Sequence, residues 1–399
     1  MNAFQTIGEL GDGRIKPGSL ITPLAFALIT VGVIFVPAER SGWDVNGVVT
    51  SLVAFATTVA VFAVFSIALN VQWGYTGIFN FGIAGFFMVG SYTAALFTLP
   101  PAEGGFESYI LGLGNDLDFI PMLDSEEWLP FLIATAAAAI VSGALAFVLS
   151  IPTLRLRQDY LAIATIGVAE LLRNIALEER GLVNSSRALN GIPQPLGGYF
   201  NGADYKWAFL AIAVVVLIVV FLAVERGIRS PWGRVLRALR EDEQATAASG
   251  KNVFGFKVQG FLLGAMLMGV GGAVYAFQHR TIGPDTFSHY FATFIFWAML
   301  VVGGSGNNKG AILGAYMVWG FYFFALQLEG YDWPDFISTT RIAALRDAMI
   351  GALIVLVLLF RPQGLLPEER SVSVWLERLV RRERRGNRHR PSRGASPSD

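Results

Sequence analysis

Residues 69–91 read LNVQWGYTGIFNFGIAGFFMVGS, and this stretch decides the fold. Most of its residues are apolar, but glycine recurs at positions 74, 77, 82, 85 and 90. Glycines let helices approach closely and let a membrane-embedded backbone open locally. Five side chains supply polar groups there, namely Asn70, Gln72, Tyr75, Thr76 and Asn80. Two interpretations stay open, namely helix packing with interhelical hydrogen bonds, or an opened segment that lines a pathway through the membrane.

The composition of the whole chain places this stretch in a membrane. Of 399 residues, 54% are apolar and 15% are charged, whereas a soluble domain carries about 25% charged residues. The apolar residues come in long, nearly uncharged runs, and a bilayer core needs about 20 such residues per helix. This composition excludes a disordered chain and a nucleic-acid binder. A disulfide scaffold is excluded because there is no cysteine, and the three histidines lack metal-ligand spacing.

We therefore expect an all-α, polytopic membrane protein with about ten transmembrane segments. The expected segments are 20–37, 48–69, 74–98, 129–150, 159–177, 206–225, 257–278, 289–304, 309–327 and 345–361. Those at 74–98, 289–304 and 309–327 are glycine-rich or short, so we expect broken or re-entrant segments there. Residues 1–19 precede this domain of residues 20–361. The tail 362–399 begins with a basic amphipathic pattern typical of a helix on the inner leaflet, and its end reads as disordered.

The distribution of charge predicts the orientation. Lysine and arginine gather at Arg155 and Arg157, in the loop 226–256 and in the tail, whereas the connection 100–128 has seven acidic residues and no basic one. Basic loops stay in the cytoplasm, so an even number of spans puts both termini on the cytoplasmic side.

Two charges fall inside an expected span. Glu170 and Arg173 are three residues apart, so they share one helix face and are able to pair. Charges at that depth are costly and usually face a bundle interior or a water-filled cavity. The pair either neutralises itself and positions the helix, or it contacts cargo. No nucleophile–base pair or metal cluster accompanies it, which argues against a membrane enzyme.

The loop 226–256 contains SPWGRVLRALREDEQATAASGKN at residues 230–252 and is too polar to span. Asp242 is a suitable N-cap for a short helix through Glu243, Ala245 and Ala248, which Gly250 would close. Such a helix is either an ordinary surface connection or an element that lies in a groove of another protein. The glycine-rich turn VGGSGNNKG at 302–310 lacks the ending of a phosphate-binding loop, so a helical hairpin is expected there.

Several stretches in order resemble the permease subunits of branched-chain amino acid ABC importers, and the M-type subunit in particular. They are LNVQWGYTGIFNFGIAGFF, LRLRQDYLAIATIGVAELLR, the LNGI of residues 189–192, SPWGRVLRALREDEQATAASGKNVFGFK, VVGGSGNNKGAILGA and RPQGLL. Together they cover most of residues 69–366. The resemblance implies a type II-like permease in the cytoplasmic membrane of a bacterium or archaeon.

The resemblance also implies partners. A second, H-type permease, two cytoplasmic ATPases that use ATP and Mg²⁺, and an extracytoplasmic binding protein would complete the importer, in contact with membrane lipid. This chain would then bind no cofactor and hydrolyse no ATP. The loop around the short helix matches the segment that docks on the ATPase, which gives this role to Arg240, Glu241, Asp242, Glu243, Ala245, Ala248 and Gly250. The candidates for the cargo pathway are Asn70, Tyr75, Thr76, Asn80, Glu170 and Arg173.

The sequence departs from the family pattern where Asn80 and Phe81 replace the usual Ser and Leu, and where Ile83 replaces the usual His. These departures leave the cargo open, and urea or another amide is the alternative to a branched-chain amino acid. An ion-coupled secondary transporter or a channel is the alternative in a different class. Its weakness is that Glu170, the one acid clearly inside an expected span, has Arg173 beside it.

Overall fold

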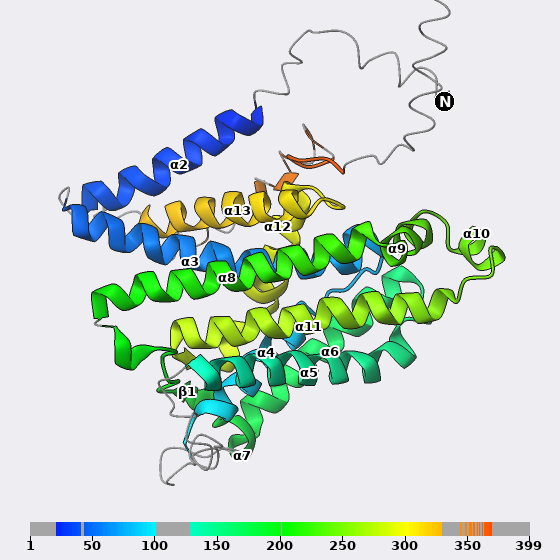
Figure 1. Cartoon of the computed structure of the whole chain (residues 1–399), viewed down its shortest axis with the longest axis horizontal. Coiled ribbons are helices and arrows are strands. Elements are labelled where there is room, and N and C mark those ends of the chain that lie inside the picture. The colour runs from blue at the N-terminus through cyan, green and yellow to red at the C-terminus, as the bar shows by residue number, and fades with distance from the viewer. Residues whose placement is uncertain are drawn as a thin grey trace, which may run out of the picture. The chain divides into compact units, whose positions relative to one another are not determined.

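The structure, a computed structural model, describes residues 21–40, 44–100, 128–200 and 202–328 and scattered positions within 344–368 (Figure 1). The residues divide into two units, Met1–Pro367 and Glu368–Asp399, and nearly all of the described ones belong to the first. Four predicted features lie outside the described residues wholly or mostly: the N-terminal segment 1–19, the acidic connection 100–128, the span 345–361 and the tail.

The described part is built almost wholly from helices. The α-helices are α2 (Ile21–Arg40), α3 (Val45–Leu69), α4 (Ile83–Thr98), α5 (Trp128–Thr153), α6 (Gln158–Glu178), α7 (Arg180–Val183), α8 (Gly202–Arg229), α9 (Pro231–Glu241), α10 (Glu243–Ala248), α11 (Val253–His279), α12 (Ile295–Gly303) and α13 (Asn308–Leu328). Two π-helices, η3 (Asn70–Tyr75) and η7 (Tyr290–Phe294), adjoin α3 and α12. Short 3₁₀ turns occupy η4 (Ser185–Arg187), η5 (Gly197–Tyr199) and η6 (Pro284–Phe287).

Six helices in the described part are long and apolar enough to cross a membrane. They are Val45–Tyr75, Trp128–Thr153, Gln158–Glu178, Asp204–Arg229, Val253–His279 and Asn308–Leu326. Ile83–Thr98 and Phe291–Gly303 are shorter apolar helices. The all-α, multi-pass class is thus confirmed, and the number of ten spans stays a prediction.

Helix α11 packs against α3, α4 and α5 and forms the centre of the bundle. Small residues let these helices meet, since a Cβ added to Gly269 would lie 2.5 Å from Ser142 Oγ and 2.6 Å from the Ala138 carbonyl oxygen. The Ser91 hydroxyl of α4 donates to the Gly272 carbonyl of α11 at 2.8 Å. Glycines in the sequence therefore mark helix crossings as well as breaks.

The three segments expected to be broken behave differently. The segment 74–98 is interrupted, because α3 continues into η3, residues 76–82 are non-helical, and α4 begins only at Ile83. The segment 289–304 consists of the π turn η7 and the short α12. The segment 309–327 is wholly helical as α13, so the interruption expected there is wrong. Gly310 and Gly314 serve instead to pack α13 closely on Gly303 of α12.

A two-residue antiparallel pair joins distant loops at one end of the bundle. Strand β1 (Leu189–Asn190) pairs with β2 (Thr281–Ile282), with Leu189 opposite Ile282. The pair fixes the segment that follows α11, from which η6 and η7 begin. It thereby positions residues 284–294 beside α6.

Candidate functional site

The break between α3 and α4 lies inside the bundle. Its first part is the π-helix Asn70–Tyr75, a form found mostly as single turns and often at functional sites. The chain then turns at Gly77, whose φ of +77° is open to glycine and strained for other residues. Backbone groups freed by such a break need partners within the protein, because a bilayer core offers none.

The polar side chains of the break supply those partners. Asn70 donates from Nδ2 to Asn308 Oδ1 at 2.9 Å and accepts from the Gly306 amide at 2.8 Å. Asn80 donates to Gln72 Oε1 at 2.8 Å and accepts from the Gly82 amide at 2.8 Å. The Thr76 hydroxyl donates to the Val71 carbonyl at 2.8 Å. Asn70, Thr76 and Asn80 are fully buried and bonded within the chain, which favours the packing interpretation; contact with cargo stays a prediction.

The capped helix expected between α8 and α11 is present. Asp242 Oδ1 accepts from the Ala245 amide at 2.9 Å and caps α10, and Gly250 has a φ of +80° where the helix ends. Thr246 is the one buried residue of α10, so Glu243, Ala245 and Ala248 face outward, as do Glu241 and Gly250 next to it. Glu243 also pairs with Lys257 of α11 at 2.6 Å. The helix is therefore held at its start and exposed along its length.

A second helix, α9, precedes α10 and was not predicted. Ser230 stands at its N-cap position, Pro231 is its first residue, and Leu236 and Leu239 are buried on one face. A Ser-Pro pair followed by leucines three residues apart is a signal for the start of a helix, so the sequence could have revealed α9. Figure 1 shows α9 and α10 together at one end of the long helices.

Helix α9 connects the exposed α10 with the break. Arg240 donates from Nη1 to the Gly74 carbonyl of η3, and its Cγ lies against Gly77, where an added Cβ would be 3.1 Å away. The guanidinium of Arg237 lies 5.5 Å from the centre of the Tyr75 ring, a cation–π distance. Beside these contacts is a cavity of about 160 Å³, lined by Thr76, Gly77, Arg157, Arg240, Glu243 and Lys257 among others. The sequence places Tyr75 in the pathway and Arg240 in the coupling segment; the structure joins these two regions through Arg237 on Tyr75 and Arg240 on Gly74.

A polar chain ties α8 and α13 to the same break. Glu225 pairs with Arg229 at 2.7 Å and accepts from Asn308 Nδ2 at 2.8 Å, and Asn308 in turn accepts from Asn70. Glu225 and Asn308 are 83 residues apart, so no local pattern could have paired them.

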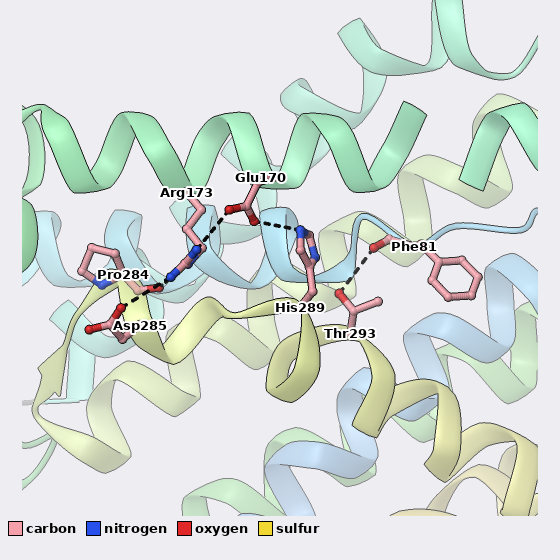
Figure 2. A network of polar contacts seen from close by, with 7 residues as sticks. All are labelled: Phe81, Glu170, Arg173, Pro284, Asp285, His289 and Thr293. Carbon is pink, nitrogen blue, oxygen red and sulfur yellow. Dashed lines mark hydrogen bonds and ion pairs between the residues drawn. The ribbon is translucent and has the colours of Figure 1, made fainter. Parts of the chain in front are cut away.

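The predicted pair of Glu170 and Arg173 forms the centre of a second site (Figure 2). Arg173 Nη1 lies 3.1 Å from Glu170 Oε1, which confirms the pairing. Arg173 also reaches Asp285 Oδ1 at 3.4 Å and the Pro284 carbonyl at 3.2 Å. His289 Nε2 lies 2.9 Å from Glu170 Oε2, close enough for an ion pair when the ring is protonated but without the alignment of a hydrogen bond. Asp285 and His289 come from η6 and from the start of η7, and sequence analysis missed both.

The described part of the chain holds no cluster of three His, Asp, Glu or Cys side chains that could bind a metal. Its two features with functional geometry are the break inside the bundle, joined through α9 to the exposed helix α10, and the charged cluster on α6. A broken helix within a membrane bundle is a feature of transport proteins.

Comparison with known proteins agrees with this class. The family model of the branched-chain amino acid transport system permease component matches residues 51–358, and the chain belongs to that family. The chain is 29% identical to the high-affinity branched-chain amino acid permease protein LivM of Salmonella typhimurium over 80% of this chain and 70% of that protein. It is 27% identical to the probable LivM of Methanocaldococcus jannaschii over 79% of this chain and 93% of that one. It is also 27% identical to the nucleoside ABC transporter permease NupC of Lactococcus lactis, over 74% and 88%. Members of this family are transport subunits, and the chain is not an enzyme.

Proposed function

We propose that this chain is the M-type permease subunit of an ATP-driven importer for branched-chain amino acids. The observation that carries the proposal is the connection from the exposed α10 through Arg240 to the Gly74 carbonyl at the break in the membrane helix. The family membership and the LivM relatives support the cargo.

The mechanism we propose is alternating access driven from the cytoplasm. Helix α10 lies in a groove of a partner ATPase through Glu241, Asp242, Glu243, Ala245, Ala248 and Gly250. When ATP and Mg²⁺ close the ATPases, α10 and α9 move together, since Asp242 both ends α9 and caps α10. Arg240 and Arg237 pass that movement to Gly74 and Tyr75, and the break between α3 and α4 absorbs it.

The assembly we propose contains a second permease of the H type, two ATPases and an extracytoplasmic binding protein. Helices α5, α6 and α8 leave large apolar side chains exposed, and Val148, Ile163 and Val219 are at least 60% exposed. Lipid and the second permease would cover these faces. We further propose ten membrane segments with both termini in the cytoplasm of a bacterium or archaeon, based on the charge of the loops.

The test is reconstitution of this chain with candidate partners encoded beside it, in liposomes loaded with ATP and Mg²⁺. We expect uptake of leucine, isoleucine or valine that requires the binding protein and ATP. Uptake by this chain alone, driven by an ion gradient, would instead show a secondary transporter. Nucleosides are a second candidate cargo because of the Lactococcus relative, and urea or another amide is the third. Competition of each compound against labelled leucine separates the three.

A further inference from the structure

Helix α6 presents a face on which exposed apolar side chains lie beside a charged one. Ile163 is 68% exposed and Leu171 is 59% exposed, and a Cβ added at Gly167 would meet nothing within 4 Å. On the same face Glu170 lies eight residues before the helix end, or about 12 Å inside it at 1.5 Å per residue. A charge at that depth is costly against lipid, so it pairs with another charge, as Glu170 does with Arg173, and faces a bundle interior or a water-filled cavity. The face is therefore suited to one side of a route.

Arg173 is bonded at all three guanidinium nitrogens: Nε to the Pro284 carbonyl, Nη1 to Glu170 and Nη2 to Asp285. Arg173 joins Glu170 at 3.1 Å and Asp285 at the longer distance of 3.4 Å, and the Asp285 side chain is 93% exposed. The contact with Asp285 is the longest of the three and ends on an exposed carboxylate, so it is the one that a cargo carboxylate would replace. An α-amino acid carries its ammonium and its carboxylate on the same α-carbon. Its ammonium complements Asp285 and Glu170, and its carboxylate complements the planar fork of Arg173.

Aromatic side chains lie next to the charged cluster, on the side away from Asp285. Figure 2 shows Asp285 and Arg173 at one end, His289 and Thr293 in the middle, and Phe81 at the other end. The Thr293 hydroxyl donates to the Phe81 carbonyl at 3.3 Å, which ties η7 to the break after α3. Phe294 is 50% exposed, and its ring centre lies 6.0 Å from that of Phe81. An apolar cargo side chain would find partly exposed aromatic rings on this surface.

We infer that the face of α6 and residues 284–294 is the cargo-contact surface of this subunit, taking α-amino acids with apolar side chains. Asp285 and Glu170 receive the ammonium, Arg173 receives the carboxylate, and Phe81 and Phe294 contact the side chain further along the route. The second permease would provide the opposite wall. The inference rests on the proposed function, and it adds Asp285, His289, Phe81 and Phe294 to the two charged residues expected from sequence.

The absence of cysteine from the chain allows a direct test. Single variants D285C and F294C, in the full complex with its ATPases and binding protein, are treated with a charged methanethiosulfonate reagent. The mass of this chain measures the reaction. We expect turnover with leucine to slow labelling at both positions severalfold, with no such effect at E178C, an exposed position at the end of the same helix. Equal labelling rates with and without leucine at positions 285 and 294 would overturn the inference.

Transport kinetics supply the second test. We expect D285N and R173K to lower leucine uptake about tenfold or more while stimulation of the ATPases by the binding protein remains, and E178Q to behave as wild type. F294A should lose uptake and F294L should retain most of it. Wild-type uptake in D285N and F294A would refute the inference and leave the importer assignment intact. If the wild-type complex carried no amino acid at all, the proposed function itself would fail.

Discussion

Arg240 offers the sharpest test of how ATP hydrolysis reaches the membrane. Its guanidinium donates to the buried Gly74 carbonyl, and a hydrogen bond from a charged donor contributes about 1.5–3 kcal/mol. We expect this bond to be present in one of the two main conformations of the transport cycle and absent in the other. Replacing Arg240 then shifts the equilibrium between these two conformations roughly 10- to 150-fold. Arg240→Ala should then leave ATP hydrolysis running while the cargo moved per ATP falls by about the same factor.

The assay measures leucine uptake and ATP hydrolysis on the same proteoliposomes. Arg234→Ala is the matched control, because Arg234 is exposed on the same helix and the substitution removes the same charge without touching Gly74. Arg240→Lys keeps the charge but loses the planar fork, and an intermediate ratio is expected. Should R240A and R234A move the same amount of cargo per ATP in assembled complexes, the proposed connection through Arg240 would be refuted.

Three further predictions concern other parts of the molecule. Asn70→Ala removes two buried hydrogen bonds and should lower the free energy of unfolding by about 2–4 kcal/mol, which is measured as a lower unfolding temperature in detergent. Asn174→Ala, at an exposed position, should leave that temperature unchanged. Asp242→Ala should lower the stability of helix α10 by about 1 kcal/mol and weaken binding of the ATPase, measured by co-purification. Asp242→Asn should keep the cap and the binding. Equal loss of ATPase binding in both variants would show that the charge of Asp242 matters and not its cap. Gly167→Leu should fold normally yet lower uptake severalfold, because its side chain would enter the cargo route, while Gly181→Leu, also in open space, should not; a fully active Gly167→Leu would remove α6 from the route.

Local patterns predicted the local parts of the site. Asp242 with three alanines and Gly250 after it specify a short capped helix whatever surrounds them, because the cap bonds lie within three residues. Glu170 and Arg173 pair because a helix turns once every 3.6 residues. Helix α9 could have been predicted by the same means, from Ser230 and Pro231.

Patterns of glycine were ambiguous, because one residue type serves two purposes. At Gly77 a positive φ makes a turn, whereas at Gly269 the missing side chain lets α11 touch α5. The same ambiguity explains why residues 309–327 were expected to be broken and form the continuous α13. Which purpose a glycine serves depends on the neighbour that approaches it, and that neighbour is far away in the chain.

The sequence alone determined that this chain crosses a membrane several times, where its six long apolar helices begin and end to within a few residues, and which loop forms the capped helix. These properties follow from hydrophobic length and from hydrogen bonds between near neighbours. Only the tertiary structure decided that Arg240 reaches Gly74, that Asn70 joins Asn308, and that Asp285 and His289 complete the cluster around Glu170. Those contacts join residues more than 100 positions apart, so they exist only once the helices have packed.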